Sequence, residues 1–183
     1  MIQSQDRSYY IGCSDTSMVV GNWKTKTFEK WWLEKLGLNK NNLSNEAMKA
    51  GNNYEHKILD SLEIVNLEKD KQIIKDRLRA NLDGNTNTCI YEVKTHNIDK
   101  EFKVSKQYWR QAQVEMYASG IHKLYIVAYG LQENDYNNYF NEIDKNRLEL
   151  INVDYDKEFI ENEYLPKLEI LTECLKKGVF PEW

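Results

Sequence analysis

Three charged residues lie close together in a central part of the chain, two of them on a short apolar segment. The stretch NLDGNTNTCIYEVKTH, residues 81–96, has Asp83 ahead of a glycine, and it has Glu92 and Lys94 on a short apolar segment. Successive side chains point to opposite faces of a strand, so Glu92 and Lys94 share one face. If NTNT forms the turn of a hairpin, Asp83 at the end of the preceding strand meets Glu92. The sequence therefore predicts two carboxylates and an amine at one site.

This combination is typical of phosphodiester cleavage. Converging carboxylates supply the oxygen ligands that a hard divalent cation prefers. Such a cation polarises a phosphoryl oxygen and lowers the pKa of a bound water, while Lys94 orients that water or stabilises charge in the transition state. The spacing D-x8-E-x-K is frequent by accident and is also compatible with an exposed ion-pair stripe that follows an ordinary Asp-Gly turn. The short pattern alone leaves both interpretations open.

The segments that position these residues alternate between helix and strand. Aromatic and apolar residues at helical spacing predict helices over 25–37 and 44–67, the second capped by Ser44 or Asn45. A strand ends at Leu82-Asp83-Gly84, and further strands are expected at 88–95, 123–130 and 147–156, with helices over 105–120 and 157–177. The predicted fold is α/β (α+β), with a mixed central sheet flanked by helices and two helices ahead of any strand.

Composition limits the chain to a few classes of protein. The 183 residues are 41% hydrophobic and 12% aromatic, which suits one compact domain over 1–183. Neither a signal peptide nor an apolar run of membrane-spanning length is present, so we expect a cytoplasmic protein of a bacterial or phage-infected cell, without a membrane partner. The three cysteines are far apart and form no CxxC pair, which argues against a zinc knuckle, a disulfide framework or an iron–sulfur cluster.

The net charge of −4 hides an asymmetry along the chain. Residues 1–123 carry 19 Lys and Arg against 16 Asp and Glu, whereas residues 124–183 carry 6 against 13. The acidic excess therefore lies in the last third. A basic working face that binds nucleic acid is compatible with this distribution.

Four blocks of sequence, in order, resemble the YqaJ-type and lambda-exonuclease-like branch of the PD-(D/E)XK nucleases. They are RSYYIGCSDTSMVVGNWKTKTFEKWWLEKLG, with an Ile-Gly-x-Ser-Asp turn and an aromatic helix; AMKAGNNYEHKIL, with a Gly-x-x-x-Glu helix; NLDGNTNTCIYEVKT, with the Asp-Gly hairpin and Glu-x-Lys strand; and QAQVEMYASG, with an Ala-Gln-Val helix. The resemblance implies a restriction-endonuclease-like core over nearly the whole chain.

The resemblance also implies roles for individual residues. Asp83, Glu92 and the backbone carbonyl of Val93 would ligate Mg²⁺, for which Mn²⁺ is expected to substitute, and Lys94 would act on the attacking water. Glu55 on the preceding helix would contribute to the metal site directly or through water. Gln113 on the later helix would contact the nucleophile or the lysine. Without the four blocks, Glu55 and Gln113 are equally compatible with a solvated helix position and a partly buried amide.

A second implied site would bind DNA phosphates. Arg7 and Ser14, with backbone amides of a helix that starts near Ser14 or Asp15, resemble the family's pocket for a 5′-terminal phosphate. An ordinary N-cap and a surface arginine explain the same residues. Lys106 and Arg110, on a basic helical edge with aromatic neighbours, suit DNA phosphates and equally a solvated face.

Three functions therefore stand open. The first is a Mg²⁺-dependent 5′ to 3′ exonuclease on double-stranded DNA ends that works beside a single-strand annealing recombinase; the resemblance implies a homo-oligomer, a ring trimer. The second is an endonuclease or structure-specific nuclease on the same core. The third is a non-catalytic module that binds DNA ends or a protein; joint retention of Asp83, Glu92, Lys94 and Gln113 argues against it.

Overall fold

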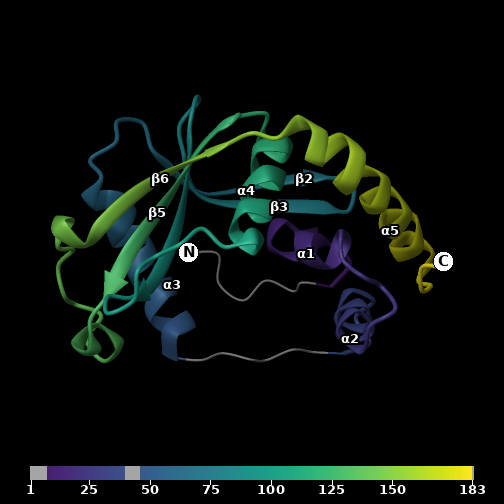
Figure 1. The fold of residues 1–183 in the computed structure, drawn as a ribbon, viewed down its shortest axis with the longest axis horizontal. Helices are drawn as coiled ribbons and strands as arrows, with labels where there is room; N and C mark the ends of the chain where they lie inside the picture. Colours follow the sequence, from purple (N-terminus) through teal and green to yellow (C-terminus); the bar gives the residue numbers. More distant parts are fainter. Residues whose placement is uncertain (1–7, 40–45, 183) are drawn as a thin grey trace.

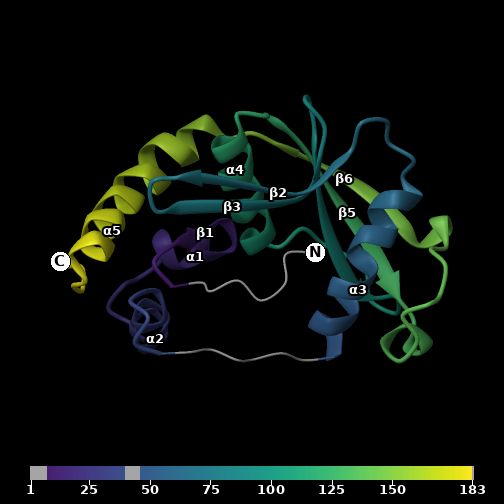
Figure 2. The same cartoon turned by 180° about the vertical axis from the view of Figure 1, so that it is seen from behind.

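The computed structural model describes residues 8–39 and 46–182. The elements in chain order are β1 (Ile11–Gly12), η1 (Cys13–Asp15), α1 (Thr16–Val19), α2 (Lys26–Lys35), α3 (Glu46–Ser61), β2 (Glu68–Lys75), β3 (Leu78–Asn85), β4 (Ile90–Asn97), α4 (Lys106–Ser119), β5 (Lys123–Leu131), η2 (Glu133–Tyr136), η3 (Lys145–Arg147), β6 (Leu148–Asp154), η4 (Phe159–Tyr164) and α5 (Leu165–Lys177). In Figures 1 and 2, α3, β5 and β6 lie toward one end of the molecule, and α2 and α5 lie toward the other.

A single mixed sheet organises the molecule. Its strand order is β1-β3-β4-β5-β6, with β2 paired to β3 outside this path. β4 and β5 are parallel over their lengths, whereas β2–β3, β3–β4 and β5–β6 are antiparallel. The α+β class with a mixed central sheet and flanking helices is therefore confirmed, and α4 makes the crossover that joins the parallel strands β4 and β5.

Helices α3 and α4 cover opposite faces of the central strands. Ile90 of β4 packs with Ala112 and Met116 of α4, while Val93 packs with Tyr54 of α3. The alternation of side chains along β4 thus follows the expected period of two, and Glu92 and Lys94 point toward α4 together with Ile90. A third cluster joins the aromatic residues of α2 to α1, α4 and α5.

Local sequence signals explain where the helices begin and end. The Ser105 hydroxyl accepts a hydrogen bond from the Tyr108 N–H at the start of α4, and Gly120 ends that helix with φ +74°. Thr25 caps α2 in the same way, and Gly37 follows that helix with φ +73°. Ser44 and Asn45, the expected caps of α3, lie outside the described residues.

Two features differ from the sequence-based expectation. A strand precedes the first long helices, because Ile11 and Gly12 form β1 and pair in parallel with the start of β3. Two residues carry too little periodicity to be recognised as a strand. The helix expected over 157–177 is present, but Phe159–Tyr164 is wound as a π-helix. Pro166 follows this segment and has no N–H to complete an ordinary α-helical turn.

Candidate active site

The site lies where strands β3 and β4 part. Their backbone pairing ends at Gly84↔Tyr91, which puts Asp83 opposite Glu92 in register. Strand β2 pairs with one edge of β3 along its length, so β1 and β4 both pair with the other edge. On that edge the pairing with β1 ends at Arg79, and the pairing with β4 begins at Gly84. Between these two contacts the edge of β3 faces a cavity of about 510 Å³. Strands β3 and β4 pair at two residue pairs and then separate, and this separation opens a space beside their charged residues.

The Asp83 side chain replaces a backbone hydrogen bond that is lost where β3 and β4 separate. Its Oδ2 accepts a hydrogen bond of 2.9 Å from the backbone N–H of Val93, a donor that continued strand pairing would otherwise satisfy. Val93, Asp83 and Glu92 all line the cavity. The hairpin thus fixes the Asp83 carboxylate at the mouth of the divergence, with its second oxygen left as a ligand atom for a cation.

Lys94 is held by a polar network with α4. Its Nζ lies 2.7 Å from Glu92 Oε1 and donates to Gln111 Oε1 at 3.3 Å. Gln111 Nε2 in turn donates to Glu92 Oε1 at 2.6 Å and to Glu115 Oε1 at 2.8 Å. The ring of Tyr108 lies 4.9 Å from Lys94 Nζ, a cation–π distance. Amine, amide and carboxylates therefore form one connected group on facing elements.

The orientation of the Gln111 amide follows from its partners. Ionised carboxylates only accept hydrogen bonds and the lysine ammonium only donates. The amide NH₂ must therefore face Glu92 and Glu115, and the amide oxygen must face Lys94. A carboxylate at position 111 would lose both donors and add negative charge.

The site concentrates negative charge away from water. Glu92 is 3% exposed and Glu115 is fully buried. Burial raises the pKa of Asp83 well above its ordinary value, and Glu92 and Glu55 raise it further. Burial and Glu92 likewise raise the pKa of Glu115, and burial with Glu92 and Asp70 raises the pKa of Glu55 to about 7. The folded chain therefore gathers more negative charge here than Lys94 balances.

Lys94 itself stays charged. Burial works to lower its pKa, but Glu92 and Asp83 outweigh burial and hold that pKa above the ordinary lysine value. A permanently charged ammonium does not act as a general base. It can neutralise phosphate charge and donate a hydrogen bond to a water or a phosphoryl oxygen.

The residues present suit a divalent cation. Two buried oxygens, Glu92 Oε2 and Glu115 Oε2, have no hydrogen-bond partner within the described part of the chain. Unsatisfied buried carboxylate oxygens are costly unless a cation or a proton joins them. Oxygen atoms are also the ligands that Mg²⁺ and Mn²⁺ prefer. Asp83, Glu92 and Glu55, which all line the cavity, are the side chains that would hold such an ion.

One predicted residue lies elsewhere. Gln113 was expected at the lysine or the nucleophile, but its Nε2 donates to the Asp154 carbonyl at 2.9 Å and its Oε1 accepts from the Asp156 N–H at 2.7 Å. The expectation for Gln113 is wrong for a geometric reason. Residues two apart on a helix lie roughly 200° apart around its axis, so only one glutamine of QAQ can face the cavity. That residue is Gln111.

Glu115 was missed by the sequence analysis. It stands four residues after Gln111, and this spacing puts the two side chains on one face of α4. The same face carries Tyr108, three residues before Gln111. Once Gln111 is chosen as the inward residue, the helical period identifies the other two.

The predicted phosphate-binding residues separate into three groups. Ser14 is exposed and lines the cavity, as do Lys35 and Arg79. Lys106 is exposed at the start of α4, and the Arg110 Nη1 donates to Ser17 Oγ at 3.4 Å; neither lines the cavity. Arg7 lies outside the described residues.

Comparison with known proteins now identifies the family. The sequence profile of the YqaJ-like viral recombinase domain matches residues 4–122, more than half of the chain and nearly every element of the site. This chain belongs to the YqaJ-like viral recombinase domain family. A comparison with curated proteins gives no significant match.

Solved structures of similar fold include exonucleases. An alkaline exonuclease from Laribacter hongkongensis (LHK-Exo) is 18% identical, with a TM-score of 0.67 and coverage of 93% of this chain and 92% of that chain. The same enzyme in complex with dAMP gives 19% identity and a TM-score of 0.68 at the same coverage. A phage related exonuclease from Haemophilus somnus 129PT is 17% identical, with a TM-score of 0.65 and 92% coverage of both chains. This chain therefore shares the fold of these exonucleases, as expected.

Proposed function

We propose that this protein is a divalent-metal-dependent deoxyribonuclease that degrades double-stranded DNA from its ends in the 5′ to 3′ direction. The observation that carries the proposal is one cavity in which Asp83, Glu92 and Lys94 converge, with a buried Glu92 oxygen that lacks a partner among the described residues. Membership of the viral recombinase family and the names of the similar structures, an alkaline exonuclease and a phage related exonuclease, support the same activity.

The chain's own residues divide the work. Asp83 and Glu92, with Glu55 and the Val93 carbonyl, would hold Mg²⁺ or Mn²⁺, which supplies a Lewis acid for the phosphoryl oxygen and a water of lowered pKa. Lys94 is fixed by Glu92 and Gln111, so its ammonium is ready to hold the attacking water or the phosphate charge.

End recognition would use the part of the cavity lining that comes from η1, α2 and β3. Ser14 offers a hydroxyl, and Lys35 and Arg79 add positive charge to the same lining. Lys35 is itself paired with Asp15 at 2.6 Å, so part of its charge is already neutralised. Arg7 remains a prediction for this pocket, and Lys106 and Arg110 remain predictions for more distant phosphates.

The assay is digestion of linear, nicked and closed-circular duplex DNA, each with Mg²⁺ and with EDTA. Loss of linear DNA alone, only with Mg²⁺, is the expected result. Cleavage of closed circles would replace the exonuclease with an endonuclease on the same core. No cleavage of any substrate by pure, folded protein, with binding of DNA ends retained, would overturn catalysis itself. Glu92→Gln is the matched inactive control, because it keeps the side-chain volume and removes the ligand charge.

The proposal extends to partners. A family of viral recombinase domains fits an exonuclease that works with a single-strand annealing protein, and a ring of three subunits would keep such an enzyme on its substrate. Size-exclusion chromatography with light scattering tests the assembly, and a single monomer mass at all concentrations would reject it.

A further inference from the structure

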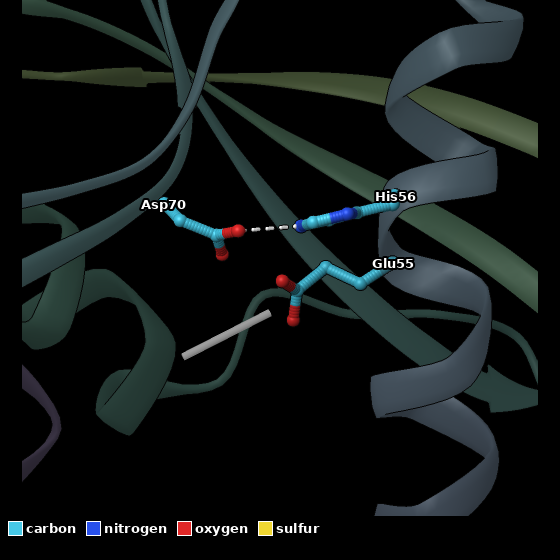
Figure 3. A group of neighbouring side chains, drawn as sticks. All are labelled: Glu55, His56 and Asp70. Atoms are coloured by element: carbon cyan, nitrogen blue, oxygen red, sulfur yellow. Dashed lines mark ion pairs between the residues drawn. The ribbon is translucent and has the colours of Figure 1, made fainter. Parts of the chain in front are cut away.

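A second group of metal-ligand side chains lies beside the cavity. Glu55 and His56 are adjacent on α3, and Asp70 comes from β2. One ligand atom from each lies within 4.8 Å of the other two. His56 Nε2 and Asp70 Oδ2 are 2.8 Å apart, and Figure 3 shows the Glu55 carboxylate beside this pair. Three donors from two elements thus converge on one point.

The group shares Glu55 with the site described above and adds two residues outside the cavity lining. Glu55 lines the cavity, whereas His56 and Asp70 do not. The neighbouring pairs Lys69↔Gly84 and Lys71↔Leu82 put Asp70 opposite Asp83 in register. Carboxylates therefore occupy matching positions on β2, β3 and β4, and the histidine stands at the β2 end of this row.

We propose that Glu55, His56 and Asp70 form a second divalent-cation site, selective for an ion that accepts imidazole nitrogen, with Zn²⁺ as the type case. A histidine nitrogen with two carboxylate oxygens is a ligand set for zinc, and Mg²⁺ takes oxygen ligands. Three protein ligands leave a fourth position for water. The proposal goes beyond the nuclease function and does not depend on it.

The geometry admits zinc after side-chain movements, which include closer approach of ligand atoms that now lie up to 4.8 Å apart. Ligands about 2.0 Å from a tetrahedral ion lie roughly 3.3 Å from one another. The 2.8 Å contact between His56 and Asp70 must therefore open by about 0.5 Å, which small torsion changes in two partly exposed side chains provide. On binding, the ion takes the Nε2 lone pair, and the imidazole keeps a single proton on Nδ1; a proton previously on Nε2 moves there or is released to solvent.

Solvent reaches the group. The His56 side chain is 41% exposed and that of Asp70 is 30% exposed. A cation can therefore enter without local unfolding, and substitution at either position removes little packing. Because the ligands come from α3 and β2, an ion bound to all three would also join the helix to the sheet.

The test uses a background that lacks the cavity site. In protein carrying Asp83→Asn and Glu92→Gln, we expect Zn²⁺ to bind with one equivalent by isothermal titration calorimetry, and Mg²⁺ at the same concentration to give no saturable binding. Adding His56→Asn or Asp70→Asn to this background should weaken zinc binding by about tenfold or more, because each removes one of three ligands. Thermal melts in EDTA establish that each variant is folded.

The matched control is His122→Asn in the same background. It removes an imidazole that stacks on Tyr155 at 4.0 Å and belongs to no metal cluster found in the described residues. Unchanged zinc affinity in this control, with loss in the His56 and Asp70 variants, supports the site. No zinc binding in the background, or full binding after both His56→Asn and Asp70→Asn, overturns it. Neither outcome bears on nuclease activity, because the background already lacks two catalytic ligands, Asp83 and Glu92.

Discussion

Asp83→Asn separates the stability of the empty site from its function. Asparagine keeps the volume and retains an oxygen that accepts the Val93 N–H, so the local backbone is preserved. The substitution removes the negative charge of a carboxylate, and burial, Glu92 and Glu55 raise the pKa of that carboxyl group. We therefore expect the metal-free variant to be more stable than the wild type at pH 8, by about 1–2 kcal/mol, within the range of single substitutions.

The sign of the pH dependence follows from the raised pKa of Asp83. Below the ordinary aspartate pKa of about 3.9, the carboxyl is protonated in the folded and unfolded states, and the difference between the proteins vanishes. As the pH rises, the unfolded chain ionises first and the folded state is penalised. The advantage of the variant should therefore grow from acidic pH toward the raised pKa and then level off.

A divalent cation should make the wild type more stable than the Asp83→Asn variant. A ligand at ten times its Kd stabilises the wild type by about 1.4 kcal/mol, which for a chain of this length is roughly 3–6 °C in Tm. Asp83→Asn should lose this gain together with cleavage. The assay is thermal unfolding at several pH values, in EDTA and in Mg²⁺, with Asp76→Asn as control, because that exposed aspartate pairs with Lys176 outside the cavity lining. An Asp83→Asn protein that is less stable than wild type in EDTA yet keeps the Mg²⁺ gain would refute the reasoning.

Three further predictions follow from the site. Lys94→Ala should lower the cleavage rate by orders of magnitude while Mg²⁺ binding, measured by calorimetry, is retained; a change in metal affinity alone would contradict its role. Gln111→Ala should lower the rate through loss of the contact with Lys94. Gln113→Ala should cost about 1 kcal/mol of unfolding free energy, with a smaller effect on rate, because it removes two hydrogen bonds to partly buried backbone groups at the end of β6. Linear duplex with a 5′-phosphate should be degraded roughly tenfold faster than the 5′-hydroxyl form, and Arg7→Ala should erase that preference; equal initial rates in the wild type, at one salt concentration, would reject the phosphate pocket.

The predictable part of the site is the part made by local geometry. Asp83 and Glu92 sit on one hairpin, and the alternation along β4 puts Lys94 on the same face as Glu92. Both placements follow from the alternation of side chains along a strand and from the turn that joins β3 to β4. Similarly, the α3 position of Glu55 follows from one long helical pattern, and Gly51 one turn earlier lets this helix approach β4, since a Cβ there would lie 3.0 Å from Thr95 Oγ1.

The parts that sequence did not predict depend on tertiary contacts. Pairing of β1 with β3 joins residues far apart in the chain through two positions, and no periodicity marks it. The choice between Gln111 and Gln113 depends on the rotation of α4 about its axis, which packing of Ala112 and Met116 on the sheet decides. The pattern QAQ holds both alternatives, and only the packed helix separates them.

Strand divergence explains why the charges stand where they do. A fully paired β3–β4 ladder would bind the Val93 N–H to backbone and would close the edge of β3 between Arg79 and Gly84. Because the ladder stops, Asp83 is needed to satisfy that N–H, and the same opening gives solvent and substrate access to Glu92. The Asp83 carboxylate, which accepts the hydrogen bond of the Val93 N–H, is thus also well placed to bind a cation. A substitution at position 83 that closed the gap with an apolar side chain would leave the Val93 donor buried and unpaired, at a cost of about 1–3 kcal/mol. Asparagine is therefore the substitution that removes the charge without breaking the strand end.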